Sequence, residues 1–158
     1  MAEEKTNVMR TLEQKKVPYT AHCYVETGET NGVKVAALLG EPPEHVFKTL
    51  VTVGKTGKNY VFVIPVADEL DLKKAAKAVG EKSIAMIKAK ELLPLTGYVH
   101  GGCSPVGMKK FFRTTIHESA KDCRTFYVSA GKIGYQIELA PADLARVIRF
   151  DYADLIVE

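Results

Sequence analysis

The chain has 158 residues, of which 46% are hydrophobic and 26% charged, and its formal net charge is +3. This length and composition are typical of one compact globular domain, so we expect a single domain over residues 1–158. No stretch approaches the ~20 apolar residues that a membrane-spanning helix needs. The N-terminus begins acidic with no apolar run behind it, so a secretory signal is not expected. The small net charge does not by itself indicate nucleic-acid binding.

The three cysteines, Cys23, Cys103 and Cys123, are odd in number and form no Cys-x-x-Cys pair. This argues against a disulfide framework and against a structural zinc site. The four histidines show no metal-ligand spacing either. The sequence therefore predicts a cytoplasmic protein without metal or cofactor, in which each cysteine is most simply a small buried hydrophobic residue.

The first forty residues predict two helices around a strand. Thr6 is a helix N-cap, with Val8, Met9 and Leu12 at helical spacing behind it, and this helix ends before Pro18. There follow a strand over Tyr19–Tyr24, a loop over Glu26–Gly32 and a helix over Val33–Leu39 that Gly40 closes.

The middle of the chain predicts a β-hairpin. Val46–Val53 and Tyr60–Val66 are rich in β-branched residues and flank a turn-forming cluster at residues 54–59. The second strand is almost continuously apolar, which indicates burial on both faces. Asp71 then caps a helix that runs to Val79 and stops at Gly80.

The second half alternates short strands and helices. Expected strands are Ser83–Ile87, Thr114–His117, Thr125–Val128 and Tyr135–Leu139; expected helices are Ala89–Leu93 before Pro94, one starting at Met108, and Pro141–Ile148. Together the elements predict an α/β fold with a mixed, largely antiparallel, barrel-like sheet surrounded by short helices.

Two segments could carry chemistry. Lys48 interrupts an apolar strand pattern, so it either reaches solvent at the strand end or projects into a cleft suited to phosphate or carboxylate. The segment Gly101–Gly107 holds three glycines, and a helix beginning after it would gather free N–H groups for an anion or oxyanion; an ordinary loop is an equally good interpretation. It matches neither a P-loop nor a nucleophile elbow, and no catalytic triad or carboxylate pair stands out.

Three motifs in order resemble one family. They are Phe47–Leu50, Gly101–Gly107 and Tyr127–Lys132, and the similarity extends from Thr6 to about Val157. The chain resembles the YbaK/EbsC family of Cys-tRNA(Pro) and Cys-tRNA(Cys) deacylases, which are related to the editing domain of bacterial prolyl-tRNA synthetases.

The resemblance implies a trans-editing hydrolase whose partners are the 3′ end of aminoacyl-tRNA and prolyl-tRNA synthetase. It implies catalytic roles for Lys48 and Gly101, with the substrate's own cysteine thiol as nucleophile. It implies that the substrate contacts Tyr24, Thr49, Gly102, Ser104, Ser129 and Gly131. Some relatives carry an aliphatic residue at Cys103, which makes this cysteine a poor candidate for an obligatory nucleophile.

Other functions stay open at this stage. A relative could clear Ala-tRNA(Pro) or Ser-tRNA, since pocket dimensions are not visible in sequence. A non-catalytic module that binds tRNA or a synthetase is also compatible with the motifs. The oligomeric state, a monomer or a weak oligomer, is undetermined.

Overall fold

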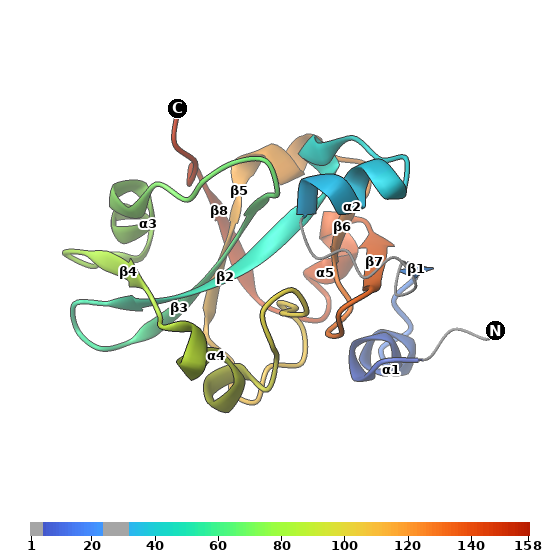
Figure 1. Cartoon of the computed structure of the whole chain (residues 1–158), viewed down its shortest axis with the longest axis horizontal. Helices are drawn as coiled ribbons and strands as arrows, with labels where there is room; N and C mark the ends of the chain where they lie inside the picture. Colours follow the sequence, from blue (N-terminus) through green and yellow to red (C-terminus); the bar gives the residue numbers. More distant parts are fainter. Residues whose placement is uncertain (1–4, 24–31) are drawn as a thin grey trace.

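The structure is a computed structural model that describes residues 5–23 and 32–158 (Figure 1). Among these residues no helix is both long and apolar enough to cross a bilayer. The helices are α1 (Asn7–Gln14), α2 (Gly32–Leu38), α3 (Leu72–Val79), α4 (Ala89–Thr96) and α5 (Pro141–Leu144), with short 3-10 turns at Pro43–His45 and Glu118–Asp122.

The strands form two open sheets within the described residues. The smaller has the order β1-β7-β6, from β1 (Thr20–Cys23), β7 (Tyr135–Leu139) and β6 (Phe126–Ser129). The larger has the order β4-β2-β3-β5-β8, from β4 (Ile84–Met86), β2 (Phe47–Gly54), β3 (Asn59–Pro65), β5 (Arg113–His117) and β8 (Phe150–Ala153). All pairs are antiparallel except β3 with β5 and β5 with β8.

The mixed α/β class and the largely antiparallel pairing are confirmed, but the barrel-like sheet is wrong. A single parallel bridge between Val46 and Tyr127 connects the two sheets. Because the strands separate after this bridge, hydrogen bonding does not continue around a closed ring.

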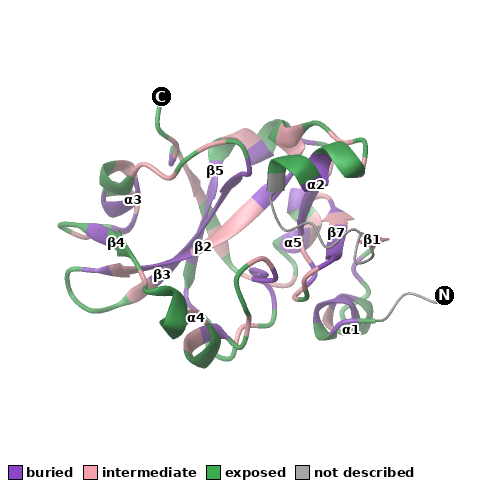
Figure 2. Ribbon diagram, viewed as in Figure 1, coloured by how far each residue is buried: buried purple, intermediate pink, exposed green. Residues whose placement is uncertain are grey.

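The predicted hairpin is confirmed as β2–β3, in register from Phe47 opposite Pro65 to Val53 opposite Asn59. Six consecutive residues of β3 are buried, because the sheet is covered on both faces. Figure 2 shows this strand in the colour of buried residues between exposed outer helix surfaces. One face of β2–β3 packs into the main core with α1, β6 and β7, and the other packs mainly on α3.

The predicted helix starts are confirmed where a local cap defines them. The Thr6 side chain accepts a hydrogen bond from Met9 N at the start of α1. Asp71 Oδ1 accepts from Lys73 N and Lys74 N at the start of α3, and Gly80 ends that helix with a φ of 76°.

Three helix predictions are wrong, two in their extent and one in that no helix forms. α4 passes through Pro94, because Thr96 Oγ1 donates to Leu92 O (2.7 Å) and Gly97 N to Leu93 O (2.8 Å), so the last turn closes without the proline N–H. α5 stops at Leu144 and tightens into i→i−3 turns. No helix begins at Met108; Lys109 N instead donates to Thr96 O and ties the segment to α4.

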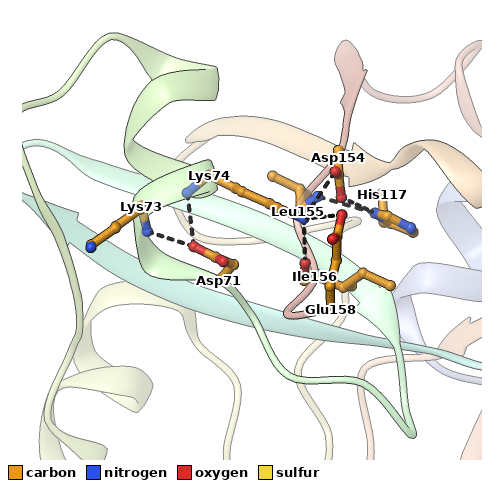
Figure 3. Close-up of polar contacts among 8 residues, drawn as sticks. All are labelled: Asp71, Lys73, Lys74, His117, Asp154, Leu155, Ile156 and Glu158. Atoms are coloured by element: carbon orange, nitrogen blue, oxygen red, sulfur yellow. Dashed lines mark hydrogen bonds and ion pairs between the residues drawn. The ribbon is translucent and has the colours of Figure 1, made fainter.

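Polar contacts tie the C-terminal residues to α3 and β5 (Figure 3). Lys74 Nζ reaches Asp154 Oδ2 (3.0 Å), the Ile156 carbonyl (2.8 Å) and Glu158 Oε1 (3.3 Å). Leu155 N donates to His117 Nδ1 at 3.1 Å, and the Leu155 side chain is fully buried. The C-terminal segment is therefore part of the packed fold, on the side of the large sheet that α3 covers.

Candidate active site

The predicted site lysine projects from β2 on the face away from the main core. It lies opposite the buried Ile64, while its neighbours Phe47 and Val51 point into the core. Lys48 is half-buried, and its side chain makes no hydrogen bond or ion pair with residues 5–23 and 32–158. None of these residues therefore competes with a ligand of opposite charge for its ammonium.

The bridge between the two sheets brings Lys48 to the same side as Ser129. Val46 and Tyr127 are paired in parallel and share a small buried cluster. Because side chains alternate along a strand, the next residues on that side are Lys48 and Ser129. Figure 1 shows β2 and β6 diverging from this bridge, and we call the region around Lys48 and Ser129, where the two strands separate, the wedge.

A polar sheet face borders this wedge. On the small sheet, alternate residues point away from the core; they are His22, Tyr127, Ser129, Gln136 and Glu138, which we call the polar face. Strand pairing places Gln136 between His22 and Ser129. Its Oε1 is buried and has no hydrogen-bond partner among the described residues.

Glu138 is held ionised within the polar face. Thr125 Oγ1 donates to its Oε2 at 2.6 Å, and His22 Nε2 lies 3.1 Å from its Oε1. The hydrogen bond from Thr125, with a smaller contribution from His22, lowers the pKa of Glu138. Burial raises the pKa of the neighbouring Tyr127, which therefore stays a neutral phenol.

The glycine-rich loop at residues 101–107 meets a second glycine-containing loop, the turn at residues 129–134 that joins β6 to β7. Gly102 packs so tightly on the backbone of the second loop that an added Cβ would lie 3.0 Å from Ile133 N. The Tyr98 ring lies between Gly107 and Gly131, and its hydroxyl donates to the Val106 carbonyl. The loops thus form one rigid wall, with few side chains between backbone and any ligand.

Thr49 contributes backbone groups to the outer edge of β2, beside Lys48. Val51 O accepts from Ile87 N at the outer edge of β2, so by alternation the N–H and C=O of Thr49 point to that edge too. Described residues provide no partner for them, because pairing with β4 begins at Thr52. The Thr49 Oγ1, on the core face, is buried and likewise lacks a hydrogen-bond partner in these parts of the chain.

The other predicted site residues have varied placements. Gly101, with a φ of 86°, is half-buried immediately before Gly102. Ser104 is fully buried and its Oγ accepts from Val106 N at 3.2 Å, so it shapes the loop from inside. Ser129 Oγ accepts from Gly131 N at 3.1 Å and shapes the facing turn. Tyr24 lies outside the described residues.

The described residues offer no activated side-chain nucleophile at the loops. Cys103 is buried, and burial raises the pKa of its thiol to about 12. Within residues 5–23 and 32–158 no group of His, Cys, Asp and Glu could hold a metal ion. The arrangement can provide a cation and backbone hydrogen-bonding groups, which suit the binding and polarisation of an ester.

Gly102→Ala is expected to destabilise the protein by about 1–3 kcal/mol, because the methyl group would overpack backbone atoms that cannot rotate away. The added Cβ would also lie 3.3 Å from Lys132 C. Thermal unfolding measures the effect. Gly102 is not among the described glycines with a positive φ, so the expected loss comes from packing and not from backbone strain. An unchanged melting temperature would show that the two loops are not tightly packed.

Solved structures identify the fold class. A hypothetical protein, APE2540, matches with a TM-score of 0.87 and 23% identity, covering 98% of this chain and 100% of that one. A structure described provisionally as a trans-editing enzyme for prolyl-tRNA synthetase matches with a TM-score of 0.81 and 23% identity, over 98% and 100% of the two chains. The fold is thus the one found in that editing-type protein.

Sequence similarity gives the family. Residues 28–147 match the model of the aminoacyl-tRNA editing domain. The chain is 46% identical over 154 residues to EbsC of Enterococcus faecalis, provisionally named a Cys-tRNA(Pro)/Cys-tRNA(Cys) deacylase, covering 97% of this chain and 94% of EbsC. The chain belongs to the aminoacyl-tRNA editing domain family. The resemblance and the expected class of enzyme, an aminoacyl-tRNA deacylase, are confirmed at this level.

The polar face and the contacts of Tyr98 were not predicted from the sequence. The alternation Tyr135-Gln136-Ile137-Glu138-Leu139 predicts that Gln136 and Glu138 share one face of a strand. Their partners His22 and Tyr127 could not be found this way, because strand pairing across the whole chain brings them together.

Proposed function

We propose that this protein hydrolyses Cys-tRNA(Pro), and possesses the same activity on Cys-tRNA(Cys), as a free-standing editing enzyme. The observation that carries the proposal is a wedge with a lysine and backbone groups, in which the described residues include no side chain suited to attack an ester. In this proposal the cysteine thiol of the substrate attacks its own ester carbonyl, and the protein positions the two groups.

The chemistry of the wedge supports this mechanism. Lys48 would hold the ribose-phosphate end or stabilise the developing thiolate. Backbone N–H groups of the loop that begins at Gly101 would stabilise the oxyanion, apart from that of Gly102, which donates to the Val99 carbonyl (3.0 Å). Positioning of the attacking group contributes ~7–11 kcal/mol to an intramolecular reaction. One preorganised donor contributes ~2.7–4 kcal/mol. These amounts are sufficient for an efficient deacylase without a triad or metal.

Each atom in the proposed step has a destination. The substrate sulfur forms a bond to the carbonyl carbon, and the bond from that carbon to the ribose oxygen breaks. The thiol proton leaves with solvent or a nearby acceptor, and a proton from water completes the freed ribose hydroxyl. The cyclic thiolactone that results is released from the tRNA, and water then opens it to cysteine, which completes the net hydrolysis.

The alternatives make different predictions for a panel of charged tRNAs. We expect hydrolysis of Cys-tRNA(Pro) while Pro-tRNA(Pro) is spared. Faster hydrolysis of Ala-tRNA(Pro) or Ser-tRNA would assign the protein to a different substrate. Binding of all these tRNAs without hydrolysis of any would indicate a non-catalytic module. Equal turnover of Cys-tRNA(Pro) and Pro-tRNA(Pro) would contradict editing.

We further propose that the protein acts in the cytoplasm alongside prolyl-tRNA synthetase, which would present the mischarged tRNA. The reason for this proposal is that the family that the chain resembles is related to the editing domain of that synthetase. Co-purification of the two proteins with and without tRNA(Pro) tests the partnership. Sedimentation of the isolated protein measures whether it is a monomer or a weak oligomer.

A further inference from the structure

A pocket with a cationic rim lies beside the proposed active site. It has a volume of about 400 Å³ and is bordered by α1, the end of α4, and both glycine-rich loops. Its lining includes the cationic residues Lys5, Arg10, Lys109 and Lys132, and among the described residues no aspartate or glutamate lines it. We call it the basic pocket. Its size lies within the range of pockets that hold small ligands or parts of larger ones.

Two of the cations are well suited to hold an anion. Arg10 donates one hydrogen bond to Asn7 Oδ1 (3.1 Å), which leaves other guanidinium donors for a ligand. Lys109 is exposed, and its aliphatic stem packs on Gly97. Lys5 is already paired with Glu13 at 2.7 Å, and Lys132 Nζ lies 5.7 Å from the centroid of the Tyr135 ring.

The first turn of α1 adds to the positive potential. Thr6, Asn7 and Val8 line the basic pocket, and the first turn carries no acidic residue. Thr6 Oγ1 uses the N–H of Met9, whereas the earlier amides have no partner inside the helix. Partial positive charge at a helix start reinforces the attraction of nearby cations for phosphate.

The basic pocket adjoins the glycine-rich loops of the proposed active site. Gly107 and Gly131 line it, and these residues belong to the two loops that meet at Gly102. The turn at residues 129–134 therefore contacts Gly102 and also borders the basic pocket. Because Ser129 begins this turn, the pocket and the wedge share one structural element.

We infer that the basic pocket binds the sugar-phosphate backbone of the tRNA acceptor strand just before its aminoacylated 3′ end. The inference rests on the proposed function, because it takes the 3′ end to lie in the wedge. A row of cations beside an aromatic ring is the usual means of holding single-stranded RNA without reading its sequence. The pocket therefore supplies affinity for tRNA, while the wedge acts on the ester.

The first experiment measures binding of an uncharged acceptor-stem RNA that ends in a single-stranded 3′ tail. Arg10→Gln combined with Lys109→Gln should weaken binding on the order of tenfold at 0.1 M salt. The slope of log K against log[salt] should fall by about 1.4, because each lost contact with single-stranded phosphate removes ~0.7. Unchanged affinity and slope would overturn the inference, whether or not the protein has deacylase activity.

The matched control removes the same charge elsewhere. Lys73→Gln combined with Lys77→Gln alters two exposed lysines on α3, at the opposite end of the molecule from α1 (Figure 1). We expect less than a twofold effect on binding. If both double variants weaken binding equally, RNA responds only to the total charge and the basic pocket is not its site.

Two further measurements separate RNA from other ligands. Inorganic phosphate at 10 mM and constant ionic strength should not displace the RNA; complete displacement would assign the pocket to a small anion instead. The double variant at Arg10 and Lys109 should also lower kcat/KM for cysteinyl-RNA on the order of tenfold, yet leave hydrolysis of cysteinyl-adenosine unchanged. An equal loss with both substrates would mean that these residues act in the wedge.

Discussion

Lys48→Met is expected to lower kcat/KM for deacylation of Cys-tRNA(Pro) by about 100- to 1,000-fold, the usual effect of removing one preorganised charge-stabilising group. Methionine keeps most of the aliphatic stem beside Ile64 and removes only the ammonium. Lys48 has no ion pair within residues 5–23 and 32–158, so no carboxylate among them loses a partner. The variant should therefore unfold within a few degrees of the wild-type melting temperature.

Lys55→Met is the matched control for this experiment. Lys55 is an exposed residue in the β2–β3 turn, and only its backbone N–H is engaged, to Ser83 O. We expect it to keep wild-type kcat/KM. A Lys48→Met protein that deacylates at the wild-type rate would remove Lys48 from the site. A Lys48→Arg variant that recovers part of the activity would indicate that charge, more than shape, is needed.

Local signals in the sequence predicted those elements whose ends depend on nearby residues. Thr6 and Asp71 cap their own helices, and the turn at residues 54–59 fixes the β2–β3 pairing. Such interactions span only a few residues, so periodicity and turn chemistry are sufficient to find them. The same reasoning placed α4 and α5 correctly but misjudged their ends, which depend on bonds formed around Pro94 and after Leu144.

Long-range pairing explains what was missed. β8 is a four-residue segment, Phe-Asp-Tyr-Ala, that becomes a strand because it pairs in parallel with β5. The division into two sheets depends on β1 pairing with β7 near the other end of the chain. No local pattern reports these contacts, so the expectation of one barrel-like sheet could not be corrected from the sequence alone.

The candidate site, too, could be predicted only in part: its residues could be selected from the sequence, but not their arrangement. Family resemblance selected Lys48, Ser129 and the glycine-rich loops, but not how they lie relative to one another. The bridge between Val46 and Tyr127 sets the side on which Lys48 and Ser129 lie, and the contact of Gly102 with the backbone at Ile133 joins the loops. These contacts join segments about 80 and 30 residues apart, a separation at which chain topology decides contact.

S-methylcysteinyl-tRNA(Pro) is expected to resist hydrolysis, with a rate at least about 1,000-fold below that of Cys-tRNA(Pro), while still binding. Methylation removes the nucleophile of the proposed mechanism, and with it the advantage of intramolecular attack. Binding should persist because Lys48 and the backbone groups near Gly101 and Gly102 are unchanged. Competition of the methylated substrate against Cys-tRNA(Pro) measures the binding, and loss of the labelled amino acid measures the cleavage.

The pH dependence gives an independent readout of the same step. A free cysteine thiol with a pKa of ~8.5 is mostly protonated at neutral pH, so the rate should rise between about pH 6.5 and 8.5 as the substrate thiolate forms. The Cys103 thiol cannot produce this profile, since burial raises its pKa to about 12. A flat profile over this range would contradict attack by the substrate thiolate.

Cys103→Ala completes the argument, because it tests the one thiol that the protein could offer at the glycine-rich loop. Cys103 is buried among apolar side chains, so its replacement should cost about 1–2 kcal/mol of stability and leave kcat/KM within about threefold of wild type. Cys123→Ala is the control, since it removes another buried cysteine outside that loop. If Cys103→Ala is inactive and the S-methyl substrate is hydrolysed normally, the protein supplies the nucleophile or activates water, and attack by the substrate thiol must be abandoned.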